Sequence, residues 1–240
     1  MIRIVQRFAV VLAVVVTGCT SGVMSPTASA SGPTRMTLFV CGVFGDGPWY
    51  DGVREAVAES GASVETVSWG LPKPLFVGNF SGHDVHEKAE AELAEKIDAA
   101  AGTLDLIGHS AGCGVILGAL AKCHRDVGRV VLIAPSVSPG NDLSSALHRS
   151  GAVHVFFSDR DTTFLKWRCS TFGTYDAVKS PAAGYSGFAQ SAANLHQYPY
   201  DPAWASLGND GGHGGGTARD FVSKIVMPRT TPTQESLSAR

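Results

Sequence analysis

The sequence carries little charge, and its positive charges are not concentrated anywhere. Charged residues make up 17% of its 240 residues, and 19 Lys and Arg against 21 Asp and Glu give a formal net charge of −2. A nucleic-acid-binding domain usually shows a basic patch or stripe. The sequence therefore indicates no nucleic-acid partner and favours a small molecule or a polymer surface.

Apolar runs long enough to cross a membrane are also lacking. The run over residues 8–16 is shorter than the roughly 20 residues that a spanning helix needs. It follows Arg3 and Arg7, and a short positive segment before a short apolar one is typical of a secretory signal peptide. We therefore expect residues 1–18 to be a signal peptide and the protein to be exported.

The residues after this apolar run predict how the leader ends. Residues 16–19, Val-Thr-Gly-Cys, resemble the bacterial lipobox, in which the cysteine becomes the lipidated first residue of the mature protein. The resemblance implies a lipid anchor on Cys19, which holds the protein at the membrane of the cell envelope without spanning it. Residues 28–30, Ala-Ser-Ala, offer a competing site for ordinary signal peptidase. Residues 19–34, rich in Ser, Thr, Pro and Gly, are expected to form a flexible tether.

Internal repeats and a linker that would divide the rest of the chain are missing as well. The chain is long enough to bury a substantial core, since 44% of its residues are hydrophobic. We expect one domain over residues 35–227. Residues 228–240 are polar and aperiodic, and we expect them to form a disordered tail.

Cysteines are few, and the sequence leaves their pairing open. Without Cys19 the chain has Cys41, Cys113, Cys123 and Cys169, an even number that suits disulfides in an oxidising compartment. Cys113 and Cys123 would lie about 15 Å apart on one helix, too far to pair with each other. One or two bridges involving Cys169 are compatible with the sequence.

Signatures of a bound cofactor or metal are lacking. The glycine-rich residues 42–47 have neither the Lys-Ser/Thr of a phosphate-binding loop nor the G-x-G-x-x-G spacing of a dinucleotide site. His83 and His86 have a spacing that suits a metal but no set of Cys or carboxylate partners, so we interpret them as the solvated start of a helix. We expect neither a cofactor nor a metal.

What the sequence does contain is an alternation of short apolar runs with helical segments, which is typical of a parallel sheet covered by helices on both faces. Six strands are expected, at residues 37–40, 63–67, 104–107, 130–134, 153–157 and 194–198. Helices are expected at residues 50–60, 86–101, 112–124, 143–150 and 217–225. The expected fold class is therefore α/β, with a mostly parallel central sheet of about six strands.

Residues 108–112, Gly-His-Ser-Ala-Gly, stand between a buried strand and a helix. The pattern G-x-S-x-G is weak by itself in a chain with 28 glycines, so its position carries the argument. A tight turn from strand to helix needs glycines around its central residue because neighbouring backbones approach closely there. Ser110 would stand at the tip of this turn, in front of the helix N-terminus, where a nucleophile is useful.

An acid and a histidine follow at the ends of later strands, and ligands bind at this edge in sheets of this kind. Asp159 and Asp161 come after the fifth strand, and His213 lies in a glycine-rich loop before the last helix. His196 is a rival base, but it lies within an apparent strand, where a packed or surface histidine is more usual. A serine needs such a base, oriented by a carboxylate, before it can act as a nucleophile.

The chain order Ser, Asp, His and these strand-end positions resemble the α/β-hydrolase superfamily. The resemblance implies that Ser110 is the nucleophile and that His213 is the base. In this family a small residue ends the strand and the acid follows three positions later. Ser158 therefore points to Asp161, rather than Asp159, as the acid.

By the same resemblance, the backbone N–H groups of Ala111 and Val43 would stabilise an oxyanion. The family often has His-Gly before the second donor, whereas Cys41 and Gly42 occupy that place here. This departure bears on the Val43 assignment more than on the fold, since the donor is a main-chain group.

The expected site is open. Many hydrolases of this fold insert a helical lid between the fourth and fifth strands, but here only about 18 residues, 135–152, intervene. This resembles the small cutinase-like members of the superfamily. Aromatic residues in the long irregular stretch 164–204 are expected either to wall one side of the pocket or to pack beneath a long loop. Between Phe164 and Trp204 they include Trp167, Phe172, Tyr175, Tyr185 and Phe188.

The resemblance implies an exported serine hydrolase that cleaves carboxylic esters through an acyl-serine intermediate. Its partner would be a small-molecule or polymer ester. Two alternatives stay open at this point. The same three residues could serve an acyltransferase or an amidase, or the fold could act as a non-catalytic binding lipoprotein. The presence of all three residues argues against the binding protein, which has no need of them.

Overall fold

The computed structural model describes most of the expected domain. The described residues are 35–71, 79 and 82–230. They belong to one compact unit, Pro33–Arg240. The expected signal peptide 1–18, Cys19 and the tether 19–34 lie outside the described residues, as do residues 231–240 of the expected tail.

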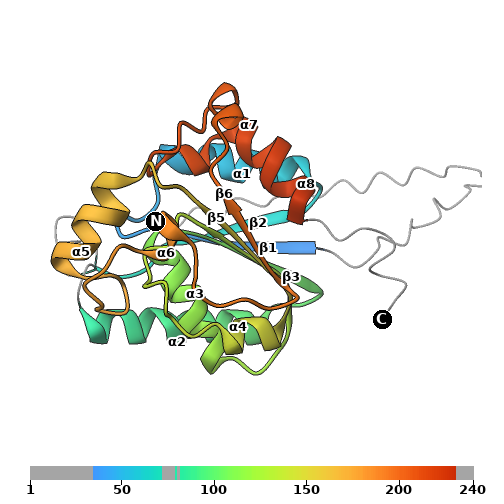
Figure 1. Ribbon diagram of the computed structural model, residues 1–240. Coiled ribbons are helices and arrows are strands. Elements are labelled where there is room, and N and C mark those ends of the chain that lie inside the picture. The colour runs from blue at the N-terminus through green and yellow to red at the C-terminus, as the bar shows by residue number, and fades with distance from the viewer. Residues whose placement is uncertain (1–34, 72–78, 80–81, 231–240) are drawn as a thin grey trace, which may run out of the picture. The chain divides into compact units, whose positions relative to one another are not determined.

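A six-stranded sheet, parallel throughout, forms the centre of this unit (Figure 1). Its strands are β1 (Arg35–Val40), β2 (Ser63–Val67), β3 (Thr103–His109), β4 (Val127–Ile133), β5 (Ser150–Phe157) and β6 (Leu195–Pro199). They are ordered β2-β1-β3-β4-β5-β6 across the sheet, which confirms the predicted α/β class. Because all strands run the same way, their carboxyl ends share one edge of the sheet, which we call the carboxyl edge.

Helices connect the strands and cover both faces of the sheet. They are α1 (Asp51–Glu59), α2 (His83–Ala99), α3 (Ala111–Lys122), α4 (Ser144–Arg149), α5 (Cys169–Phe172), α6 (Ala183–Ser186), α7 (Arg219–Phe221) and α8 (Met227–Thr230). Helical segments of the 3₁₀ or π type lie at Pro48–Tyr50, Thr162–Arg168, Pro202–Leu207, Gly215–Thr217 and Val222–Val226. Figure 1 shows α1, α7 and α8 on one face and α2, α3 and α4 on the other. Within the described part of the chain, no helix has the length and apolar character to cross a membrane.

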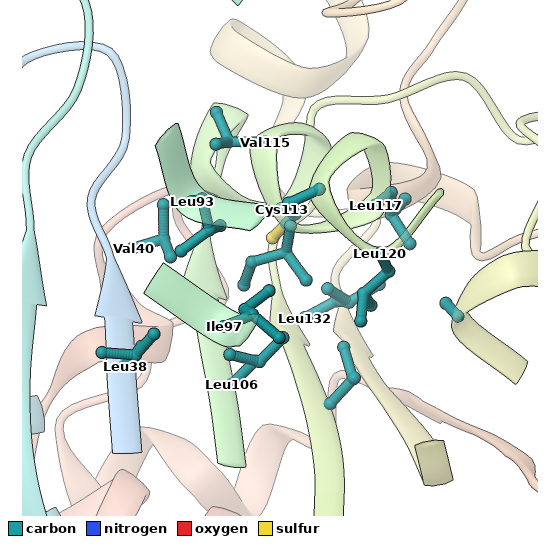
Figure 2. Close-up of a cluster of buried hydrophobic side chains, with 14 of the residues drawn as sticks. Leu38, Val40, Leu93, Ile97, Leu106, Cys113, Val115, Leu117, Leu120 and Leu132 are labelled. Atoms are coloured by element: carbon teal, nitrogen blue, oxygen red, sulfur yellow. The ribbon is translucent and has the colours of Figure 1, made fainter. Parts of the chain in front are cut away.

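Alternate residues of the central strands supply two cores, one on each face of the sheet. On β1, Leu38 and Val40 pack with α2 and α3, whereas Phe39 packs with α1. Figure 2 shows the first of these cores, where Leu93 of α2 and Leu120 of α3 lie over the strands. Strands that are buried on both faces need apolar residues at nearly every position, which is why they appear in the sequence as continuous apolar runs.

The structure differs from the sequence predictions in two places. Helix α8 ends at Thr230, which is buried, so the ordered domain continues past the expected end at residue 227. The expected irregular stretch 164–204 is also partly helical, because a π-helical segment at Thr162–Arg168 continues directly as α5. Asp161 caps this segment, since its side chain accepts hydrogen bonds from two backbone N–H groups of the first turn.

The four cysteines of the domain are free thiols, and all four are buried. The disulfides that the sequence left open are therefore not formed. Burial raises the pKa of the Cys41 thiol to about 12, and it also raises the pKa of Cys113, Cys123 and Cys169. Each thiol lies in a hydrophobic cluster, where it packs as a small apolar side chain.

Candidate active site

Ser110 occupies a strained turn between β3 and α3. Its backbone, with φ of 56° and ψ of −124°, adopts a conformation that residues other than glycine rarely take. At Gly112 a Cβ atom would stand 2.3 Å from the carbonyl oxygen of Val40, so the helix can begin this close to β1 only with glycine there. The turn holds Ser110 at the carboxyl edge of the sheet.

His213 and Asp161 lie beside Ser110. Nε2 of His213 is 3.0 Å from Oγ of Ser110, and Nδ1 of His213 is 2.6 Å from Oδ2 of Asp161. The carboxylate is buried, and its other oxygen accepts hydrogen bonds from the N–H groups of Phe164 and Leu165. Because a carboxylate only accepts, Nδ1 of His213 carries the proton, which leaves Nε2 as an acceptor for the Ser110 hydroxyl.

The rival acid and base lie apart from this group. Asp159 is exposed, and the carboxylate bonded to His213 belongs to Asp161. His196 stands on β6, where its ring stacks on His154 of β5 with 5.0 Å between centroids. The three side chains brought together are therefore the three that the resemblance selected, and they come from the loops after β3, after β5 and before α7.

Tyr50 and His109 form a second, buried chain of hydrogen bonds, which the sequence did not reveal. Nε2 of His109 is 2.9 Å from the carbonyl oxygen of His213, and Nδ1 is 2.9 Å from the Tyr50 hydroxyl. The same hydroxyl accepts a hydrogen bond from the N–H of Gly42 at 3.0 Å. Burial lowers the pKa of His109 to about 3, with the nearby His213 acting in the same direction, so this ring is neutral.

The direction of each bond in this second chain follows from its partners. A carbonyl oxygen only accepts, so Nε2 of His109 donates to His213, and Nδ1 of the neutral ring accepts the hydroxyl proton of Tyr50. The chain therefore runs from the N–H of Gly42 to the backbone of His213. It connects the loop that contains Val43 with the loop that carries the expected base.

The two expected oxyanion donors lie next to Ser110. Ala111 is the first residue of α3, and the first N–H groups of a helix have no acceptor within that helix. Val43 follows Gly42, where a Cβ atom would stand 3.2 Å from Cβ of Ser110. The loop after β1 thus passes directly beside the serine, and this placement favours both N–H groups as oxyanion donors.

A cavity of about 340 Å³ opens beside Ser110 and His213. The segment between β1 and α1 supplies half of its lining residues, which are Gly42, Val43, Phe44, Trp49 and Tyr50. Among the described residues that line it there is no Asp, Glu, Lys or Arg, and an uncharged, largely apolar group therefore fits there. The connection between β4 and β5 holds one short helix, α4, as expected for an open site.

Most of the aromatic residues expected to wall the pocket lie elsewhere. Trp167 and Phe172 are exposed, and their rings meet edge to face with 6.4 Å between the ring centroids. Tyr185 and Phe188 pack in interior clusters. Of this set, only Phe164 contacts the group formed by Ser110, His213 and Asp161. Its ring stacks on that of His213, with 4.7 Å between the ring centroids.

The expectation of a solvated helix start holds for His83 and is wrong for His86. His83 is exposed, whereas His86 is buried, with Nε2 2.8 Å from the carbonyl oxygen of Asn79. The His86 ring stacks on that of Tyr175, with 4.0 Å between the ring centroids. Packing within the fold, rather than a ligand, therefore explains the position of His86. Within the described ranges, no group of three or more His, Cys, Asp or Glu side chains is arranged to hold a metal ion.

Comparison with known proteins identifies the fold. No protein-family model matches the sequence, and no curated protein matches it either. Among solved structures, one from the metagenome-derived lipolytic enzymes LipS and LipT is 10% identical, covers 82% of this chain and 94% of its own, and has a TM-score of 0.52. Est1E from Butyrivibrio proteoclasticus, solved with ferulic acid bound, is 11% identical, with coverages of 84% and 91% and a TM-score of 0.50.

Proposed function

We propose that this chain, which has the α/β-hydrolase fold, is a serine hydrolase that cleaves carboxylic esters. The observation that carries the proposal is the hydrogen-bonded chain Asp161–His213–Ser110, set in a strained turn at the mouth of an apolar cavity. A structural role does not require a serine in an unfavourable conformation beside a histidine whose accepting nitrogen faces it. The lipolytic activity named for one of the similar structures supports the same class of substrate.

The proposed reaction proceeds in two steps. His213 Nε2 takes the hydroxyl proton of Ser110 as Oγ attacks the ester carbonyl, and Asp161 stabilises the imidazolium that forms. The N–H groups of Ala111 and Val43 hold the oxyanion. Collapse of the tetrahedral intermediate expels the alcohol, which receives the proton from His213. Water then attacks the acyl-Ser110 ester in the same way, and the open site gives it access.

The test uses residues 33–240, the compact unit that contains both hydrophobic cores. We expect it to hydrolyse p-nitrophenyl esters of short and medium chain length and to be labelled at Ser110 by a fluorophosphonate, located by peptide mass mapping. Ser136 lies in a small cavity beside Ser110 and is the matched control, since Ser136→Ala should still be labelled. Absence of both turnover and labelling in the wild type would refute the proposal and favour a binding protein.

The Asp161→Asn variant is expected to lower kcat about 10⁴-fold, because an amide in this place favours the wrong tautomer of His213. Asp159→Asn is the matched control, since Asp159 is exposed and has no part in the chain of hydrogen bonds. It should retain kcat within about twofold. Steady-state kinetics on a p-nitrophenyl ester measures both, and similar losses in the two variants would contradict the assignment of the acid.

The Tyr50→Phe variant is expected to lower kcat about 10- to 100-fold with little change in KM, because the Val43 loop and the His213 loop lose their connection. Phe keeps the ring contact with Phe39 but leaves the N–H of Gly42 and Nδ1 of His109 unpaired, at a cost of about 1–3 kcal/mol in folding free energy.

The matched control for Tyr50→Phe is Tyr198→Phe. The Tyr198 hydroxyl lies 3.2 Å from Nδ1 of His154, so this variant removes the same kind of contact away from Ser110. Chemical denaturation should show both variants to be destabilised, whereas only Tyr50→Phe should lose kcat. A loss of kcat that follows stability in both variants would show that Tyr50 has no positioning role.

We further propose that the protein is exported and held at the cell envelope by a lipid on Cys19. Residues 16–19 support this through their resemblance to a lipobox. The full chain, expressed in bacteria with radiolabelled palmitate, should incorporate label and fractionate with membranes. Cys19→Ser should lose both properties, and label retained by that variant would contradict an anchor at this residue.

A further inference from the structure

Large apolar side chains are exposed on one side of the described structure only. Each of those that are more than about a third exposed lies in a connection, irregular or helical, that follows the carboxyl end of a strand. They are Phe44, Trp49, Leu71, Phe164, Trp167, Phe172 and Val178. The first two follow β1, Leu71 follows β2, and the other four follow β5. Ser110 and its cavity stand at this same edge.

The opposite edge of the sheet has a different surface. The connections that lead into the amino ends of the strands are residues 60–62, 100–102, 123–126 and 187–194. Small and polar residues predominate in them, and Phe188, the one large apolar residue among them, is buried. The exposed aromatic side chains are therefore not a general property of the surface of this protein.

The helical segment from Thr162 through Phe172 is apolar on both of its sides. Leu165 and Cys169, four positions apart, face inward and are buried in one small cluster. The outer side nevertheless carries Trp167, which is 64% exposed, and Phe172, which is 66% exposed. Since the inner side already fixes the helix to the domain, the outer aromatic side chains are not needed to hold it in place.

The charges of this segment have one sign. Lys166 and Arg168 lie within it, and residues 162–172 contain no acidic residue. Of the acids near it, Asp161 is bonded to His213 and Asp176 accepts hydrogen bonds from its neighbours, and Asp46 is paired with Arg54 at 2.6 Å. Asp159, three positions before the segment, is exposed. In a chain with a net charge of −2, a helix that presents Trp167 and Phe172 beside the exposed Lys166 is complementary to a negatively charged apolar surface.

We propose that the aromatic edge, formed by Phe44, Trp49, Phe164, Trp167 and Phe172, docks on a lipid surface that carries negative charge. Phe44 and Trp49 line the cavity beside Ser110, so docking would place the mouth of the cavity against the lipid. Lys166, which is exposed, would face the headgroups. This inference rests on the surface of the carboxyl edge and goes beyond the proposed hydrolysis, since docking does not require turnover.

The experiment measures co-sedimentation of residues 33–240, which lack Cys19, with vesicles of phosphatidylcholine alone or with phosphatidylglycerol. We expect binding to the anionic vesicles and at least about tenfold weaker binding to the neutral ones. Replacing both outer aromatic residues, Trp167→Ser and Phe172→Ser, should weaken binding to the anionic vesicles by about tenfold or more. Equal binding to both kinds of vesicle, or binding to neither, would overturn the proposal.

Two controls keep docking separate from folding and from hydrolysis. Lys166→Gln should weaken binding, whereas Lys88→Gln, which removes an exposed charge on α2, should not. The double aromatic variant should keep its thermal midpoint and its turnover of a monomeric, water-soluble p-nitrophenyl ester, a reaction that tests the proposed function alone. Undiminished vesicle binding by the double variant would overturn the proposal, as would a dimer of the wild type that this variant abolishes in light-scattering measurements.

Discussion

The Ser110→Ala variant is expected to hydrolyse p-nitrophenyl esters with a kcat about 10⁶-fold below that of the wild type. The methyl group cannot form the acyl intermediate, and His213 loses the hydroxyl whose oxygen lies 3.0 Å from its Nε2. A small residual rate above that of water should persist, because the oxyanion donors and the cavity remain. Titration with a fluorophosphonate in parallel with steady-state kinetics measures both the rate and the fraction of active sites.

A Ser110→Gly variant provides the matched comparison. It should be as inactive as Ser110→Ala but more stable by about 1 kcal/mol, because glycine relieves the strained backbone conformation while losing more entropy on folding. Chemical denaturation of the two variants measures the difference. More than about 1% of wild-type kcat in Ser110→Ala would remove this residue from the role of nucleophile. Equal stability of Ala and Gly would show that the strain at this residue is no larger than the entropic cost of glycine.

The His213→Gln variant is expected to lower kcat by about 10⁵- to 10⁶-fold, because it removes the base and the group through which Asp161 acts. The matched variant is His196→Gln, since His196 lies on β6 and stacks on His154 rather than approaching Ser110. It should keep kcat within about twofold.

The pH dependence of the variants adds a second readout for the histidine base. Burial lowers the pKa of His109 to about 3, so the His109 ring does not titrate between pH 5 and 9. Wild type and His196→Gln should share one pH profile of kcat/KM over that range. A large loss in His196→Gln, or an active His213→Gln with an unchanged profile, would contradict the assignment of the base.

The elements of the fold could be predicted because their signals are local. Most of β3 is apolar, with Leu104, Leu106 and Ile107 around the buried Asp105. The sequence also predicts β2 at its observed bounds, Ser63–Val67. The glycines around Ser110 are likewise dictated by contacts within a few residues and to the adjacent strand. The group Ser110, Asp161 and His213 was selected by order along the chain, and parallel strands translate that order into a shared edge.

The rest of the site depends on contacts between distant residues, which a local pattern cannot reveal. Tyr50 and His109 are 59 positions apart, and each by itself is an ordinary residue of a turn or a strand end. The sequence allows aromatic residues of the long stretch after β5 to wall the cavity, whereas Phe44 and Trp49, between β1 and α1, line it in the structure. The sequence does not predict the helical segment after Asp161, because this segment spans few turns and its apolar residues face both inward and outward.

The four buried thiols have a practical consequence. Disulfides usually stabilise exported domains by limiting the unfolded chain, whereas this domain depends on its two hydrophobic cores for stability. Its thiols, buried and with raised pKa values, present little thiolate to oxidants or to alkylating reagents. The domain should therefore reach the same native state in the presence or absence of dithiothreitol, so that it can be produced in a reducing cytosol as readily as outside it.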